Sequence, residues 1–304
     1  MGKSKSPTGP PLVVRTYQEL DGFVQAFADG HLNLLILTGG PGLGKSRALK
    51  AAIGSSACII EGSATAFGMY LRLFEGCDLP VLIDDVDGIH KDHSAIRLLK
   101  SLCQSEPLKT ISWNSDARTL AQRNIPREFR TASKVAIIAN DWQRLNVDIG
   151  AVEDRGHRIH FEPSSSEVHR QVASWFWDQD VFDFISENLA LIGEPSFRHY
   201  IMAAELKQAK LDWKQFVLAR CLSGKLLVVA QLKAVDQFAS EEDRVRAFVE
   251  GGHGCRATYF NIAKKLPDKI NAPKIILTAR PPEISNPLDL VAFLGRSYRK
   301  LGNG

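Results

Sequence analysis

The segment of this chain with the clearest chemistry is residues 39–46, which read Gly-Gly-Pro-Gly-Leu-Gly-Lys-Ser. The run fits the phosphate-loop pattern G-x-x-x-x-G-K-[ST] without a mismatch. In such a loop the backbone N–H groups surround phosphate oxygens, the lysine reaches the β- and γ-phosphates, and the hydroxyl holds Mg²⁺. The sequence therefore predicts a site for ATP and Mg²⁺. The residues expected at the nucleotide are Gly39, Gly40, Pro41, Gly42, Leu43, Gly44, Lys45, Ser46 and Arg47.

The flanks of this loop have the composition that a phosphate loop requires. Residues 34–37 are an apolar run of buried-strand length, and residues 47–53 read as a helix. A strand, a glycine turn and a helix together direct backbone N–H groups and the positive helix end at phosphates. This context favours nucleotide binding over a chance glycine turn in a surface loop.

Polar side chains end two further apolar runs. Residues 81–83 are followed by Asp84 and Asp85, and residues 135–139 are followed by Asn140. We expect Asp84 to bind Mg²⁺ together with Ser46, and Asp85 to orient an attacking water. Asn140 is expected to contact the γ-phosphate or that water. The alternatives are a solvated acidic turn for the aspartates and an ordinary strand-end cap for the asparagine.

The elements that would position these residues alternate between strand and helix. Alternation of this kind predicts an α/β fold with a parallel sheet and crossover helices, in which ligands bind at the carboxyl ends of the strands. The helix before the first strand is expected over 17–28. The expected strands are 33–38, 57–61, 80–84, 134–139 and 157–162.

The pattern becomes helical after Pro163. Helices are expected at 167–177, 181–191, 196–209 and 213–221, followed by a helix-turn-helix at 241–250 and 257–266. A short strand at 274–278 and a last helix at 289–298 complete the prediction. The predicted organisation is a disordered arm at 1–11, a nucleotide-binding core at 12–163, a helical subdomain at 164–222 and a small helical C-terminal domain at 223–304.

The order of these features resembles that of the AAA+ ATPases. The resemblance covers residues 13–222 and rests on the phosphate loop, Asp84-Asp85, Asn140, Glu153-Asp154-Arg155 before the fifth strand, and the helical region after it. It implies a P-loop sheet followed by a helical lid. By the same resemblance Asn140 is the first sensor, Arg198 the second sensor, and Arg155 an arginine finger acting in trans in a homo-oligomer.

One residue departs from the family pattern. The family usually has glutamate after the metal-binding aspartate, and this chain has Asp85, whose side chain is one methylene shorter. The shorter side chain reaches less far toward a water molecule. Slow hydrolysis, or a nucleotide-held switch that seldom turns over, is the expected consequence.

Two basic regions are candidates for contact with DNA. Around the predicted helix-turn-helix, the residues expected to contact nucleic acid are Arg256, Thr258, Tyr259, Asn261, Lys264 and Lys265. DNA-acting members of the resembled family, such as replication initiators, helicase loaders and transposition regulators, have a similar layout. The second region is the insertion 108–131, where aromatic residues are interleaved with basic ones. The aromatic residues are Trp113 and Phe129, and the basic residues are Lys109, Arg118, Arg123, Arg127 and Arg130. The alternatives are a helical hairpin with a solvated basic face and a surface loop packed by Trp113.

Composition limits the remaining possibilities. Five scattered cysteines argue against a disulfide framework and a zinc site, and no apolar run has transmembrane length, so a cytoplasmic protein without membrane contact is expected. The leading interpretation is an oligomeric, DNA-acting ATPase. The alternative is a nucleotide-gated switch that binds an unknown protein partner. A small-molecule kinase is a third possibility, which the positions of Asn140 and Arg155 disfavour.

Overall fold

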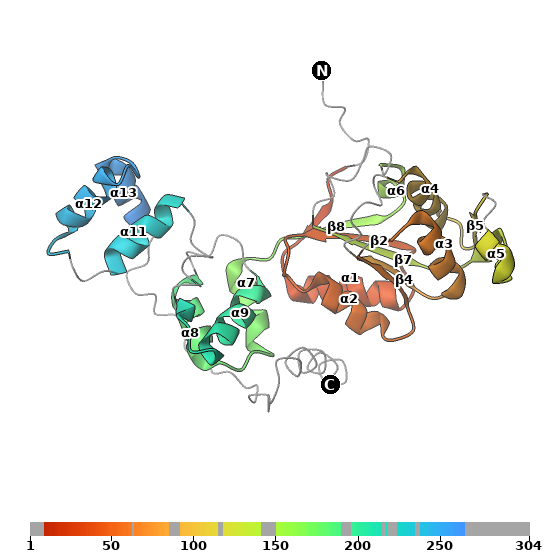
Figure 1. Ribbon diagram of the computed structural model, residues 1–304, viewed down its shortest axis with the longest axis horizontal. Helices are drawn as coiled ribbons and strands as arrows, with labels where there is room; N and C mark the ends of the chain where they lie inside the picture. Colours follow the sequence, from red (N-terminus) through yellow and green to blue (C-terminus); the bar gives the residue numbers. More distant parts are fainter. Residues whose placement is uncertain are drawn as a thin grey trace, which may run out of the picture. The chain divides into compact units, whose positions relative to one another are not determined.

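The computed structural model describes residues 9–62, 64–84, 92–114, 118–140, 150–189, 196–214, 217, 224–234 and 238–264. The chain divides into two units, Met1–Pro163 and Ser164–Gly304 (Figure 1). Each unit is described by itself. No helix within the described ranges combines the length and the apolar character needed to cross a lipid bilayer.

The first unit is built on a six-stranded sheet in the order β1-β8-β2-β7-β4-β3, in which every neighbouring pair is parallel. All five expected strands are present with nearly the expected bounds, which confirms the predicted α/β class. The edge strand β1 was missed, because three residues are too few to show a pattern. The strands are β1 Leu12–Val14, β2 Leu34–Gly39, β3 Cys58–Glu61, β4 Val81–Asp84, β7 Val135–Ala139 and β8 His157–Phe161.

Helices cover both faces of this sheet, as short parallel strands require. Helices α1 and α2 lie on one face, whereas α3, α4 and α6 lie on the other (Figure 1). The helix α1 begins at a capping box in which Thr16 and Glu19 satisfy each other's backbone N–H groups. The helices are α1 Tyr17–Ala28, α2 Lys45–Ile53, α3 Ala66–Glu75, α4 His93–Leu102, α5 Arg118–Gln122 and α6 Gly150–Glu153.

The insertion between α4 and β7 forms its own small antiparallel sheet, from β5 Lys109–Ser112 and β6 Glu128–Thr131, with α5 between the strands. Its aromatic residues face inward. Trp113 contacts Phe67 and Tyr70, and Phe129 contacts Tyr70 and Phe74. The expectation that Trp113 and Phe129 form a stacking surface for bases is therefore wrong, because both rings pack against α3 and the rest of the core. The expected contact of Lys109 with nucleic acid is also wrong, because Lys109 is fully buried and its Nζ donates to the carbonyl oxygen of Ser133.

The second unit is helical throughout its described residues. The helices α7 Ser165–Ala173, α8 Gln179–Glu187 and α9 Phe197–Gln208 surround a core that contains the buried aromatics Trp175, Phe176 and Phe182. The helices α11 Gly224–Ala234, α12 Glu241–Glu250 and α13 Arg256–Ala263 pack on one another around Phe248 and Tyr259. The expected strand 274–278 and helix 289–298 lie outside the described residues, as does most of the expected helix 213–221.

Candidate functional site

The glycine loop joins the carboxyl end of β2 to the start of α2. Gly39 has φ 147°, and a Cβ added there would lie 2.4 Å from the carbonyl oxygen of Phe161. Gly44 is the N-cap of α2 in the left-handed conformation, and no side-chain hydrogen bond caps the helix there. The first N–H groups of α2 are thus left to a ligand at the positive end of the helix dipole. This is the backbone geometry that phosphate oxygens bind.

Lys45 is folded back into this loop. Its side chain is buried, and Nζ donates hydrogen bonds to the carbonyl oxygens of Gly39 at 2.8 Å and Gly40 at 2.6 Å. Nζ also lies 3.5 Å from Oδ1 of Asn140. The loop therefore holds a positive charge inside its own bend, where it would attract the β- and γ-phosphates of a nucleotide.

Ser46 and Asp84 come together from elements 38 positions apart in the chain. The Ser46 hydroxyl donates to Oδ1 of Asp84 at 2.9 Å. Asp84 is the last residue of β4, and it is only 8% exposed. A hydroxyl and a carboxylate side by side at the carboxyl edge of the sheet form an oxygen donor pair beside the phosphate loop.

This donor pair fits Mg²⁺ carried by a nucleotide. Mg²⁺ prefers oxygen ligands, and in nucleotide sites it is held by one or two protein groups together with phosphate oxygens and water. Among the described residues no group of three or more His, Cys, Asp or Glu side chains could hold a metal by itself. The Ser46–Asp84 pair therefore suits a metal that arrives with phosphate oxygens and water as its other ligands.

Asn140 owes its position to the strand order. It directly follows β7, which pairs with β2 on one side and with β4 on the other. Its amide therefore lies between the strand that carries the glycine loop and the strand that ends in Asp84. Asp85, the residue expected to orient water, lies outside the described residues.

Arg155 lies at the amino-terminal ends of the strands, whereas the glycine loop lies at their carboxyl ends. It is an exposed residue in the turn before β8, and Nη1 donates to the carbonyl oxygen of Lys100 at 3.0 Å. In the register of β2 and β8, His157 pairs with Leu35 and Phe161 pairs with Gly39. Because four residues of strand span about 13 Å, Arg155 cannot reach the loop of its own chain.

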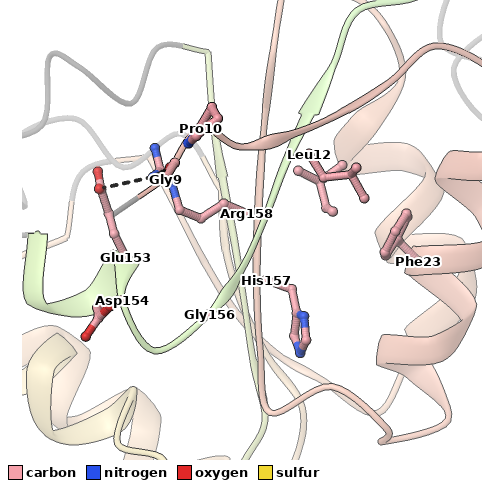
Figure 2. Close-up of a pocket in the computed structure, with 10 residues that line it drawn as sticks. Gly9, Pro10, Leu12, Phe23, Glu153, Asp154, Gly156, His157 and Arg158 are labelled. Atoms are coloured by element: carbon pink, nitrogen blue, oxygen red, sulfur yellow. Dashed lines mark hydrogen bonds and ion pairs between the residues drawn. The ribbon is translucent and has the colours of Figure 1, made fainter. Parts of the chain in front are cut away.

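A hollow of about 450 Å³ adjoins these amino-terminal ends, beside β1 and the start of β8. Figure 2 shows Glu153 and Arg158 facing each other there, with Nη1 of Arg158 3.5 Å from Oε2 of Glu153. Arg158 also donates to the carbonyl oxygen of Gly9 at 2.9 Å, which fastens the start of the described chain to β8. The hollow is lined by residues at the amino-terminal ends of the strands, so it is distinct from the candidate phosphate site.

Arg198 belongs to the second unit. It is exposed in the first turn of α9, where its backbone N–H donates to Oγ of Ser196. The residues that the structure brings together are thus Lys45, Ser46, Asp84 and Asn140, all in the first unit.

The residues expected to contact nucleic acid differ in their exposure. Tyr259 is fully buried, and its hydroxyl donates to Oε1 of Glu241, so its expected contact with nucleic acid is wrong: the ring belongs to the core around Phe248. Asn261 and Lys264 are exposed on α13, and Thr258 is half-buried. The remaining two are Arg256, which forms an ion pair with Glu242, and Lys265, which lies outside the described residues.

Sequence reasoning missed two charged residues beside Asp84. Nζ of Lys50 lies 3.7 Å from Oδ2 of Asp84 and 2.5 Å from Oε2 of Glu61. The spacing of four between Ser46 and Lys50, which puts both on one face of a helix, was the available signal for Lys50. Glu61 had no such signal, because its approach depends on the pairing of β3 with β4.

Comparison with known proteins adds little about activity. No family model matches the chain. Over 140 residues the chain is 27% identical to an uncharacterized 36.7 kDa protein in the nrdC-mobD intergenic region of Enterobacteria phage T4. The matched segment is 43% of this chain and 41% of the phage protein, so the chain spans less than half the length of this relative.

Proposed function

We propose that this protein is an ATPase that binds ATP with Mg²⁺ at the carboxyl edge of the parallel sheet and acts on DNA. The observation that carries the proposal is the 2.9 Å contact between Ser46 and Asp84 beside a glycine loop that encloses the Lys45 ammonium. A buried cation, helix N–H groups and an oxygen donor pair are the three things that a magnesium–triphosphate requires.

In this proposal each residue stabilises charge at a different atom. Lys45 neutralises the β- and γ-phosphate oxygens. Ser46 and Asp84 would hold Mg²⁺, which would supply positive charge beside the phosphates. Asn140 positions the γ-phosphate or the attacking water, because its amide lies beside Lys45. Asp85 orients that water. Catalysis of this kind is positioning and electrostatic stabilisation, with little covalent work for the protein.

The proposal includes assembly into a homo-oligomer of the AAA+ kind. Arg155 is exposed at the amino-terminal ends of the strands, far from the loop of its own chain, and Nη1 donates to the carbonyl oxygen of Lys100. In the oligomer its guanidinium would therefore contact the nucleotide of a neighbouring subunit rather than its own. A guanidinium supplied in this way contributes about 10³–10⁵ in rate. By the resemblance to AAA+ ATPases, the proposal assigns α7, α8 and α9 to the lid and Arg198 to the second sensor.

The proposed DNA contact rests on exposed arginines of the insertion. Arg118, Arg123 and Arg130 are all exposed, and none of them has an ion-pair partner within the described part of the chain. Since Trp113 and Phe129 are packed inside, such a surface would bind phosphates and would not stack on bases. Asn261 and Lys264 on α13 supply a second exposed polar surface.

Binding of a fluorescent ATP analogue, with Mg²⁺ and with EDTA, tests the nucleotide site. We expect saturable, Mg²⁺-strengthened binding that Lys45→Ala abolishes and that Lys264→Ala, which removes a lysine from the other unit, leaves intact. Hydrolysis is then measured with and without DNA. Stimulation of hydrolysis by DNA supports a DNA-acting ATPase. Assembly driven by ATP without hydrolysis supports the alternative, a nucleotide-gated switch, which the short side chain of Asp85 favours. A folded wild-type protein that binds no ATP would overturn the proposal.

A further inference from the structure

We propose that Lys50 and Glu61 form an opposed charge pair that tunes how strongly the Ser46–Asp84 site holds a divalent cation. Lys50 weakens cation binding, and Glu61 offsets it. This inference rests on the proposed nucleotide function and adds to it two residues that the phosphate-loop pattern does not contain.

The geometry begins on one face of α2. Ser46 and Lys50 are one helical turn apart, so both side chains reach the end of β4. Ser46 donates to Oδ1 of Asp84 at 2.9 Å, and Nζ of Lys50 lies 3.7 Å from Oδ2. The two oxygens of a single carboxylate are therefore engaged by the same helix, one by a neutral hydroxyl and the other by a cation.

Glu61 completes the arrangement from the neighbouring strand. It is the last residue of β3 and lies directly opposite Asp84 in the parallel register. Its Oε2 is 2.5 Å from Nζ of Lys50, closer than Asp84 is. Lys50 is thus shared between two carboxylates and lies nearer the more exposed of them. The side chain of Glu61 is 59% exposed, and the side chain of Asp84, taken without its backbone, is 11% exposed.

Electrostatics fixes the sign of each contribution. A cation bound to Asp84 would lie a few ångströms from the Lys50 ammonium, and like charges at that separation repel. The Glu61 carboxylate attracts the same cation and also holds the ammonium away from Asp84. Because Lys50 and Glu61 are partly exposed, solvent screens both effects, and we expect each residue to change cation-assisted binding about three- to fivefold.

A purely structural role for the Lys50–Glu61 contact predicts a different result. If the Lys50–Glu61 contact merely held α2 against β3, removing either partner would loosen the site, and both variants would weaken binding. If the pair acts through charge, Lys50→Met strengthens cation-assisted binding and Glu61→Gln weakens it. The double variant, in which both charges are removed, returns close to the wild-type value.

The experiment measures the affinity of the full chain for a fluorescent ADP analogue in EDTA and in Mg²⁺, and takes the ratio of the two dissociation constants. Lys50→Gln also removes the charge and is measured as a second variant, so that the test stands if Lys50→Met does not fold. Lys225→Met and Glu250→Gln, exposed residues of the second unit that have no part in the proposed sites, control for net charge. Opposite shifts that shrink in high salt are the expected result. Shifts in the same direction, or none, overturn the inference while leaving the proposed function standing. A wild-type ratio of one overturns both.

Discussion

The Ser46 hydroxyl donates a hydrogen bond to Oδ1 of Asp84, which joins the first turn of α2 to the tip of β4. The strand β7 separates β2 from β4, so this bond crosses the carboxyl end of an intervening strand. Asn140 ends that strand and lies near Lys45. The contact therefore brings polar groups from the ends of three neighbouring strands to one side of the sheet.

Replacing Asp84 with asparagine tests whether this carboxylate binds the metal. The amide keeps the shape of the side chain and its hydrogen bond with Ser46, but it removes the negative charge that binds Mg²⁺. We expect nucleotide binding in EDTA to be retained and the strengthening by Mg²⁺ to fall about tenfold or more, as for a lost interaction with a charged group. Calorimetric titration of ADP with and without Mg²⁺ measures both values. Equal loss in both conditions would show that Asp84 supports the fold rather than the metal.

Mixing two inactive variants tests whether Arg155 acts between subunits. Arg155→Ala alone should lower the hydrolysis rate by about 10³-fold or more while nucleotide binding stays intact. Lys45→Ala subunits bind no nucleotide but still carry Arg155. If the residues of one site come from two chains, mixtures regain part of the wild-type rate. Rates that stay at background at every mixing ratio would contradict action in trans.

Salt dependence tests the arginines of the insertion. Arg123→Ala and Arg130→Ala should each weaken binding to duplex DNA of any sequence and reduce the slope of log K against log salt by about one. Fluorescence anisotropy at several salt concentrations measures this slope. Tyr259→Phe serves as the matched control, because its ring is buried and its loss of one hydrogen bond should affect stability only. An unchanged slope in both arginine variants would place the DNA contact elsewhere.

The buried His169 predicts a pH-dependent stability. Its ring is 4% exposed, stacks on Phe182 with ring centres 3.9 Å apart, and meets the Tyr200 hydroxyl through Nδ1. Burial lowers the pKa of His169 from 6.5 to about 4. Between these values the unfolded chain takes up a proton that the folded chain does not, so stability is complete above pH 6.5 and falls as the pH drops toward 4.

The expected loss is about 2 kcal/mol in the free energy of unfolding between pH 7.5 and pH 5. Urea titrations at both pH values measure it. His169→Gln, which cannot become charged, should be less stable at pH 7.5 but should lose much less between the two pH values. A variant that loses as much as the wild type would show that carboxylates, rather than His169, cause the acid sensitivity.

Much of the candidate site followed from local patterns. The glycine loop and the apolar run that ends in Asp84 each carry a signal within ten residues, and parallel strands bring their carboxyl ends to one edge. These two signals and the parallel arrangement are enough to predict that Ser46 lies close to Asp84. Glu61 could not be found in this way, since its approach to Lys50 depends on which strand is the neighbour of β4.

Burial was the weaker part of the prediction. Tyr259 lies on a short helix with polar neighbours, and only the packing of α13 on α12 and α11 decides that its ring points inward. The arginines around Trp113 favour a nucleic-acid role, but this residue directly follows β5 and its ring packs against Tyr70. In both cases tertiary contacts outweighed the composition of the segment.

The sheet order determines when, during folding, the glycine loop gains its flanking strands. In β2, Leu34 pairs with Val135 and Leu35 pairs with His157, so the strand that leads into the glycine loop is flanked only by segments made much later in synthesis. Pairing over such long sequence separations is slow, because the chain loses the entropy of loop closure before the stabilising contacts between the strands can form. The loop leaves the ribosome early, but its flanking strands are complete only after Phe161 has emerged, so the candidate phosphate site forms late in folding.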